Sequence, residues 1–265
     1  MNSLVDHIYV INMKKDKQRL NYFKKQVDGL FTYEIWEGVD VTTSKYAKIY
    51  NSWMLQTYDD DYSTFNWKYY IERYKDLKDA TIFTKDKAWW HWINYGKKEL
   101  RTCNPDNEIV NKGQLGCLLS HLEILKDAKK NNYENILILE DDIIVSKYYN
   151  NFNLSKIKKY SEKYDIIYVG AGQYHWDNIY INKNTYIANN TTGTFAYIAQ
   201  KNIYDTLIKE IYKLKKPIDQ YYIDLQKTNQ FFVVYPNLFY CDLENSNIGE
   251  SRSNNVWYKK FKWIK

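Results

Sequence analysis

The sequence lacks any apolar run that approaches the roughly 20 residues needed to cross a bilayer. Its first residues, Met1 to His7, also lack the basic-then-apolar layout of a secretory signal peptide. Both absences predict a soluble protein of the cytoplasm. We therefore interpret the N-glycosylation sequons at Asn153, Asn189 and Asn190 as chance matches.

Cysteine, proline and glycine are scarce, with 3, 3 and 9 residues in a chain of 265. The cysteines, Cys103, Cys117 and Cys241, are odd in number and form no metal-ligand spacing, so a disulfide framework is not expected. A reducing compartment is the simpler assumption. The 45% hydrophobic content, to which 28 Tyr and 9 Trp contribute heavily, excludes a disordered chain.

The charge of the chain is mixed rather than one-sided. Its net charge of +6 is the small difference between 38 basic and 32 acidic residues spread along the sequence. This excess favours anionic ligands such as nucleotide diphosphates only weakly. No nucleic-acid-binding module is recognisable, so no nucleic-acid partner is expected.

Three short apolar runs predict strands. His7–Asn12 is rich in β-branched residues, and Ile136–Leu139 and Asp165–Val169 are typical of strands covered on both faces of a mostly parallel sheet. Helical patterns over Lys14–Lys25 and Gln114–Lys130 alternate with these strands. The alternation predicts an α/β fold in which residues 1–265 form a single domain.

Residues 46–104 interrupt the alternation with an aromatic-dense segment. Its apolar residues recur at helical spacing, which predicts an inserted helical hairpin. The second helix is expected to end at Gly96 in a left-handed conformation. The helices would carry Trp67, Tyr70, Tyr74 and Leu77, and Ala88, Trp89, Trp92 and Ile93.

The most informative polar residues are Glu140, Asp141 and Asp142, directly after the apolar run Ile136–Leu139. Ligands of open α/β sheets bind at the carboxyl ends of the strands, where these carboxylates should lie. Carboxylate oxygens suit Mg²⁺ or Mn²⁺, which could bridge the phosphates of a nucleotide sugar. The alternative is a solvated acidic turn.

Several ordered motifs resemble those of glycosyltransferase family 25, which includes lipooligosaccharide sugar transferases and collagen hydroxylysine galactosyltransferases. The resemblance covers about residues 1–45 and 105–250. The residues that carry it are Ile8–Asn12 with Arg19, Gly116–His121, Ile136–Asp142, Asp165–Gly170, Gly193–Tyr197 and Pro217–Asp219.

The resemblance implies an A-type glycosyltransferase fold, a Rossmann-like, mostly parallel sheet flanked by helices. It implies a UDP-sugar donor, galactose or glucose, a divalent metal at Glu140, Asp141 and Asp142, and inversion at the anomeric carbon. The acceptor would be a glycan, a lipid-linked glycan or a protein, as in lipopolysaccharide or glycoprotein biosynthesis. Inversion requires a base, for which Asp219 is the first choice and Asp224 and Glu244 are alternatives. Asp219 could equally cap the helix that follows it.

The donor site would draw on residues from several motifs. Arg19 could meet a phosphate or organise the uridine pocket, and His121 could bind donor phosphate or support the acidic loop. Each has a structural alternative, such as a turn for Asp40 or close strand packing for Gly193. The predicted nucleotide-sugar-binding residues are Asn12, Arg19, Asp40, Ser120, His121, Glu140, Asp141 and Gly193.

The sequence also departs from the family pattern. It has Ser246-Asn247-Ile248 where the family commonly has Ser-Asp-Ile, and no His beyond position 175, so Asp242 or Glu244 would have to complete a metal shell. Such changes keep open a catalytically inactive carbohydrate-binding protein, and a phosphohydrolase is a third alternative. The basic, aromatic tail Trp257–Lys265 suits either peripheral membrane contact or a docked helix. The aromatic residues of the insertion could form an acceptor platform or, as we favour, a small core.

Overall fold

The computed structural model describes residues 1–57, 61–63, 65–99, 101–103, 108–109, 111–150, 164–176, 180–182, 184–244 and 253–263. The chain divides into two compact units. The sheet unit comprises Met1–Val39, Leu119–Tyr212 and Ile218–Lys265, and the helical unit comprises Asp40–Leu118 and Lys213–Pro217. Each unit is described by itself.

An eight-stranded mixed sheet is the centre of the sheet unit, in the order β2-β1-β3-β8-β5-β9-β7-β6 among the described residues. Strands β1, β2 and β3 are parallel, as are β5 and β9, whereas β8 and β7 run antiparallel to their neighbours. The α/β prediction with a largely parallel sheet is confirmed. The strands are β1 His7–Asn12, β2 Glu34–Glu37, β3 Asn135–Glu140, β5 Ile166–Gln173, β6 Tyr180–Asn182, β7 Thr185–Ile187, β8 Thr191–Gln200 and β9 Phe231–Val234.

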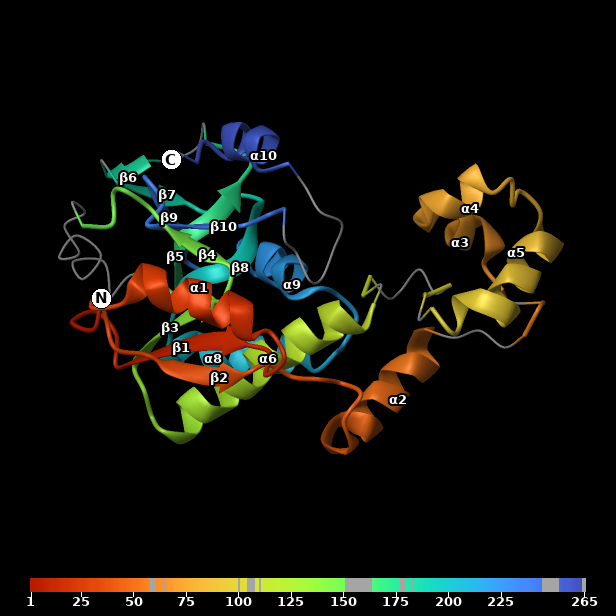
Figure 1. Cartoon of the computed structure of the whole chain (residues 1–265), viewed down its shortest axis with the longest axis horizontal. Helices are drawn as coiled ribbons and strands as arrows, with labels where there is room; N and C mark the ends of the chain where they lie inside the picture. The colour runs from red at the N-terminus through yellow and green to blue at the C-terminus, as the bar shows by residue number, and fades with distance from the viewer. Residues whose placement is uncertain are drawn as a thin grey trace. The chain divides into compact units, whose positions relative to one another are not determined.

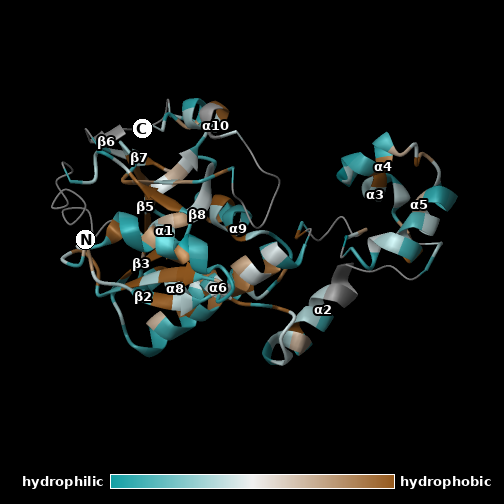
Figure 2. Ribbon diagram, viewed as in Figure 1, coloured by the Kyte–Doolittle hydropathy of each residue, from teal (hydrophilic) through white to brown (hydrophobic). Residues whose placement is uncertain are grey.

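Helices cover the sheet, and a short two-stranded sheet adjoins it (Figure 1). The small sheet pairs β4 (Ile143–Val145) with β10 (Phe239–Cys241) in antiparallel fashion. Figure 2 shows strongly apolar strands in the middle of this unit, as expected for strands buried on both faces. The helices of the sheet unit are α1 Lys17–Val27, α6 Lys112–Lys130, which begins in the helical unit, α8 Lys201–Ile211, α9 Ile218–Leu225 and α10 Asn254–Lys260.

The apolar runs identified in the sequence form the core of the sheet unit. All four residues Ile136–Leu139 are 0% exposed. Val10 of β1 lies opposite Leu139 of β3, and Leu139 lies opposite Ala196 of β8. Because β1 and β3 are parallel neighbours, the polar residues that follow these two strands emerge at the same edge of the sheet.

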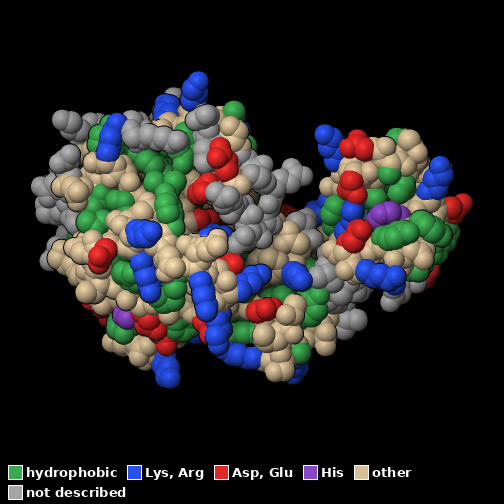
Figure 3. Space-filling view, viewed as in Figure 1, with side chains coloured by type: hydrophobic (Ala, Val, Ile, Leu, Met, Phe, Trp, Pro, Cys, Tyr) green, Lys and Arg blue, Asp and Glu red, His purple; other side chains and the backbone are tan. Residues whose placement is uncertain are grey.

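The helical unit has its own small aromatic core. Buried Tyr70, Leu77 and Trp92 pack together within it, which supports the core interpretation of the insertion. Charged side chains of both signs lie among the other side chains on the face shown in Figure 3. The described elements of the helical unit are the 3-10 helix η1 Ser44–Tyr46, α2 Ala47–Thr57, α3 Trp67–Arg73, α4 Lys75–Asp79, α5 Lys85–His91 and the π-helix η2 Trp92–Gly96.

Two details of this unit differ from the sequence prediction. The first predicted helix breaks at Tyr74, whose φ of −115° is extended, so α3 and α4 are separate. Gly96 does not adopt the left-handed conformation that we expected. Glycine is needed at position 96 for another reason. A Cβ atom there would overlap the hydroxyl of Tyr70 and lie 2.8 Å from the ring of Trp92.

The C-terminal segment docks on the sheet unit through its aromatic side chains. Tyr258, Phe261 and Trp263 are buried, and the indole Nε1 of Trp263 donates a hydrogen bond of 2.7 Å to the carbonyl oxygen of Ala171. The structure therefore shows a docked helix, which is one of the two alternatives predicted for this segment. Within the described part of the chain, no helix is both long and apolar enough to span a membrane.

Candidate active site

The ends of β1 and β3 meet through side chains. Asn12 is the last residue of β1, and the register of the two strands brings it beside the loop that follows β3. Its amide Nδ2 donates a hydrogen bond of 2.6 Å to Oδ2 of Asp141. Both residues are buried. The structure thus brings together two residues that were predicted from separate motifs.

Arg19, on α1, completes this group. Its Nη2 forms ion pairs with Oδ1 of Asp141 and, at 3.0 Å, with Oδ2 of Asp142. Burial alone would lower the pKa of Arg19, but the charges of Asp142 and Asp141 offset this and leave the pKa raised. Arg19 therefore holds the acidic loop, and its contact with a phosphate or with the uridine pocket stays a prediction.

Asp142 is left with an unsatisfied oxygen. Its Oδ1 is buried and has no hydrogen-bond partner among the described residues, while its backbone oxygen accepts a hydrogen bond of 3.0 Å from Asp242 N. Burial and the neighbouring charge of Glu140 raise the pKa of Asp142, and Arg19 only partly counteracts them. Burial also raises the pKa of Asp141, against the opposing effects of Arg19 and Asn12. Buried carboxyl groups whose ionised form is disfavoured in this way fit a site where a bound cation would compensate their charge.

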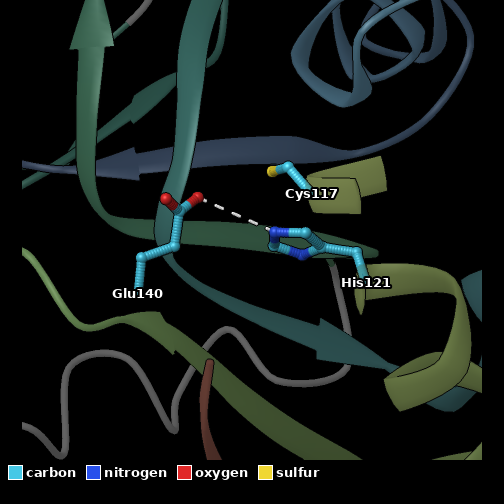
Figure 4. Close-up of side chains that lie close together, drawn as sticks. All are labelled: Cys117, His121 and Glu140. Atoms are coloured by element: carbon cyan, nitrogen blue, oxygen red, sulfur yellow. Dashed lines mark ion pairs between the residues drawn. The ribbon is translucent and has the colours of Figure 1, made fainter. Parts of the chain in front are cut away.

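His121 faces the acidic loop from α6. It is 0% exposed, and its Nδ1 lies 2.9 Å from the hydroxyl of Tyr197. Its Nε2 lies 3.7 Å from Oε1 of Glu140 and has no hydrogen-bond partner among the described residues (Figure 4). Cys117 precedes His121 by one turn of the same helix. Ligand atoms of Cys117, His121 and Glu140 all lie within 4.8 Å of one another.

A chain of hydroxyl groups connects His121 to α9. The hydroxyl of Tyr197, on β8, lies 2.9 Å from that of Tyr222, on α9. Asp219 is one turn before Tyr222 and is half-buried. Burial is the main cause of the raised pKa of Tyr168 on β5, and the charge of Asp219 adds a smaller effect. Because Tyr222 contacts Tyr197 of β8, Asp219, one turn earlier, lies on the face of α9 that is turned towards the sheet.

The alternative bases have different surroundings. Asp224 is exposed, and its Oδ1 pairs with Nζ of Lys227 at 3.1 Å. Glu244 is also exposed, and its backbone N donates a hydrogen bond of 3.0 Å to Oδ1 of Asp242. Of the three candidates, Asp219 is the one on the helix face that carries Tyr222.

Two other predicted residues, Ser120 and Asp40, have structural contacts. Oγ of the buried Ser120 accepts a hydrogen bond of 2.9 Å from Val39 N, which anchors the segment after β2. The carboxylate of Asp40 is exposed and accepts a hydrogen bond of 2.9 Å from Thr42 N, as in a turn. Their contacts with a donor remain predictions.

Gly193 has a φ of +84°, and a Cβ atom there would lie 2.9 Å from the ring of Phe195. Close packing on β8 therefore requires glycine at this position, whether or not a sugar approaches it. The Ser246-Asn247-Ile248 element lies outside the described residues.

The sequence interpretation missed Tyr222, and it found no metal-ligand spacing for Cys117, whose sulfur lies within 4.8 Å of possible ligand atoms of His121 and Glu140. The spacing of Cys117 and His121, one turn apart in a predicted helix, was a signal that could have placed them on one face. The contact between Tyr197 and Tyr222 had no comparable signal, because it joins a strand and a helix that are distant in the sequence.

A mixed α/β sheet with an acidic loop at the carboxyl end of β3 defines a candidate enzyme site of the kind that nucleotide-binding transferases use. Residues 5–222 match the family described as "Glycosyltransferase family 25 (LPS biosynthesis protein)". The match covers most of the sequence, and the chain belongs to this family of glycosyltransferases.

Solved structures provide distant likenesses. The glycosyltransferase GlyE of Streptococcus pneumoniae TIGR4 is 8% identical to this chain, with a TM-score of 0.41. The likeness covers 96% of this chain but only 59% of GlyE. A glycosyltransferase involved in glycosylation of the major capsid of PBCV-1 is 10% identical with a TM-score of 0.34, over 97% of this chain and 98% of that chain. UDP-glucose pyrophosphorylase complexed with UDP-glucose is 8% identical with a TM-score of 0.38, over 97% of both chains. No curated protein matches this chain. The family assignment rests on the sequence match.

Proposed function

We propose that this glycosyltransferase is an inverting enzyme that moves a hexose, glucose or galactose, from a UDP-sugar to an acceptor hydroxyl on a glycan, a lipid-linked glycan or a protein. The observation that carries the proposal is the acidic loop after β3. In this loop the buried Oδ1 of Asp142 has no partner among the described residues, although Arg19 is nearby. A divalent cation, Mn²⁺ or Mg²⁺, would satisfy it.

The residues present fit such a cation. Glu140, Asp141 and Asp142 supply hard oxygen ligands, and Glu140 lies with Cys117 and His121 in a group whose ligand atoms are all within 4.8 Å of one another. Burial raises the pKa of Asp141 and of Asp142, and a cation beside them would offset the cost of burying their charges. When bound, the cation would neutralise charge that develops on the departing diphosphate. Asn12 and Arg19 hold the loop in place through their contacts with Asp141.

On the acceptor side, Asp219 is proposed as the general base. The acceptor oxygen attacks the anomeric carbon, the bond from that carbon to the phosphate oxygen breaks with its electron pair leaving on UDP, and the acceptor proton passes to the carboxylate of Asp219. A direct displacement of this kind inverts the anomeric configuration. The position of Asp219 on the same face of α9 as Tyr222, which contacts Tyr197 of β8, supports this role.

The test is product analysis with UDP-glucose and UDP-galactose, and with GDP- and CMP-sugars for comparison. Acceptors would include simple glycosides and hydroxylysine, and proton NMR would report the anomeric configuration of the product. We expect release of UDP and a product with the opposite configuration to the donor. Asp219→Asn should lose at least about 100-fold in kcat, while Asp224→Asn, on the same helix but exposed, should retain activity. A retained configuration would contradict the inverting mechanism.

A further inference from the structure

We propose that His121 is a ligand of the divalent cation together with Glu140, so that the cation lies between α6 and the end of β3. This inference deepens the proposed function and rests on it. It assigns His121 to the cation directly, in place of the contact with donor phosphate that the sequence suggested. It also makes the site partly nitrogen-liganded, which carboxylates alone would not be.

The first observation is an unsatisfied buried nitrogen. His121 is 0% exposed, and its Nε2 has no hydrogen-bond partner among the described residues. A buried polar atom that is left unpaired destabilises the folded protein. The nitrogen points towards the carboxylate of Glu140 (Figure 4), so a group that binds both would remove this destabilisation.

The second observation is the distance between the two side chains. Nε2 of His121 and Oε1 of Glu140 are 3.7 Å apart, which is too long for a hydrogen bond. Nitrogen and oxygen ligands lie about 2.1 Å from a transition-metal ion such as Zn²⁺, so two ligands at a tetrahedral or slightly wider angle are about 3.4–3.7 Å apart. The observed separation therefore fits two ligands of one cation.

The third observation is the partner of the other ring nitrogen. Nδ1 of His121 lies 2.9 Å from the hydroxyl of Tyr197, which in turn lies 2.9 Å from that of Tyr222. In the tautomer in which Nδ1 is protonated and donates a hydrogen bond to the hydroxyl of Tyr197, Nε2 presents its lone pair to a metal. Metal-binding histidines usually have such a partner, which fixes both the tautomer and the ring orientation. Tyr197 thus acts as a positioning residue for the site.

The donor types indicate which cation would bind. An imidazole nitrogen, with the thiol of Cys117 one turn away on the same helix, favours Mn²⁺ and especially Zn²⁺ or Co²⁺ over Mg²⁺, which prefers oxygen ligands. Asp141, by contrast, is engaged by Asn12 and Arg19. The affinity for the cation is therefore expected to depend more on His121 and Glu140 than on Asp141.

Pulsed EPR of Mn²⁺ bound to the full chain tests the proposal without donor or acceptor. A ligating imidazole gives nitrogen-14 coupling to Mn²⁺, and we expect this coupling in the wild type. We expect it to disappear in His121→Gln and to remain in His7→Gln, which changes a histidine paired with Glu34 elsewhere. Calorimetry should show Mn²⁺ affinity at least about 10-fold weaker in His121→Gln and about 10-fold weaker in Tyr197→Phe.

The wild-type measurement is decisive even if a variant fails to fold. Bound Mn²⁺ without nitrogen coupling, or unchanged coupling in folded His121→Gln, would overturn the inference. Absence of Mn²⁺, Zn²⁺ and Co²⁺ binding in calorimetry would also overturn it. If UDP-sugar transfer then persists in the presence of a chelator, the proposed sugar transfer stands, and the cation site fails together with the role proposed for the cation in that transfer.

Discussion

Arg19 and Asp142 are joined by an ion pair of 3.0 Å that links helix α1 to the loop after β3. The same guanidinium nitrogen also contacts Asp141. One positive charge therefore faces two carboxyl groups, and with both of them ionised the group would have a net charge of −1 before Glu140 is included. The residues that hold the loop in place thus leave it short of positive charge, which is the condition for binding a cation.

Arg19→Gln should strongly destabilise the protein. The substitution leaves the buried Asp141 and the largely buried Asp142 without their counter-ion, and breaking a buried pair in this way costs about 3–5 kcal/mol. Urea denaturation at neutral pH measures the change. Lys15→Gln removes an exposed charge from the segment between β1 and α1 and serves as the control, with an expected change below about 0.5 kcal/mol. Equal effects in the two variants would show that the ion pairs of Arg19 contribute little.

Asp142→Asn should make the metal-free protein more stable near neutral pH, although it should abolish metal-dependent turnover. The pKa of Asp142 is raised on folding, so the folded state binds its proton more tightly than the unfolded state. Stability from this group is complete below the unfolded pKa of about 3.9 and is lost as pH rises towards the raised folded value. Asparagine removes that loss.

Denaturation of the wild type and of Asp142→Asn without divalent cations, at about pH 5 and about pH 8, tests this predicted direction of the pH dependence. The advantage of Asp142→Asn should be larger at the higher pH. Each tenfold change in proton affinity corresponds to about 1.4 kcal/mol. An advantage that is independent of pH, or a net loss of stability at the higher pH, would mean that the charge of Asp142 is not disfavoured in the folded protein.

Gly193→Ala should destabilise the sheet unit by about 1–3 kcal/mol. The new Cβ would lie 2.9 Å from Phe195, and the backbone has a φ of +84°. Gly29→Ala is a matched control, because Gly29 has a similar φ of +73° but no atom within 4 Å of the added Cβ. It should show only the backbone strain of about 1 kcal/mol. If thermal unfolding gives the same loss for both, packing against Phe195 is not the reason for glycine at position 193.

The order and type of the main elements followed from local sequence patterns. The run His7–Asn12 forms β1 with the predicted bounds, because a strand buried in a parallel sheet needs a continuous apolar stretch. The run Ile136–Leu139 forms the buried part of β3 for the same reason. The break at Tyr74 and the role of Gly96 were not predictable, since both depend on how aromatic side chains pack within the helical unit.

The site was predictable in outline but not in its contacts. The position of Glu140, Asp141 and Asp142 after a buried strand identified the edge of the sheet where the site lies. The sequence could not show that Arg19 turns towards Asp141 and Asp142, or that His121 faces Glu140. Those directions depend on side-chain packing between α1, α6 and β3.

The most direct test of the central claim is a thermal-shift panel of UDP-, GDP- and CMP-sugars with and without Mn²⁺, repeated on Asp142→Asn. Ligand at about 100 times its Kd should stabilise the folded protein by about 2.7 kcal/mol. We predict stabilisation by a UDP-sugar that requires Mn²⁺ and disappears in Asp142→Asn. Folded protein that no nucleotide sugar stabilises in the presence of Mn²⁺ would contradict the account.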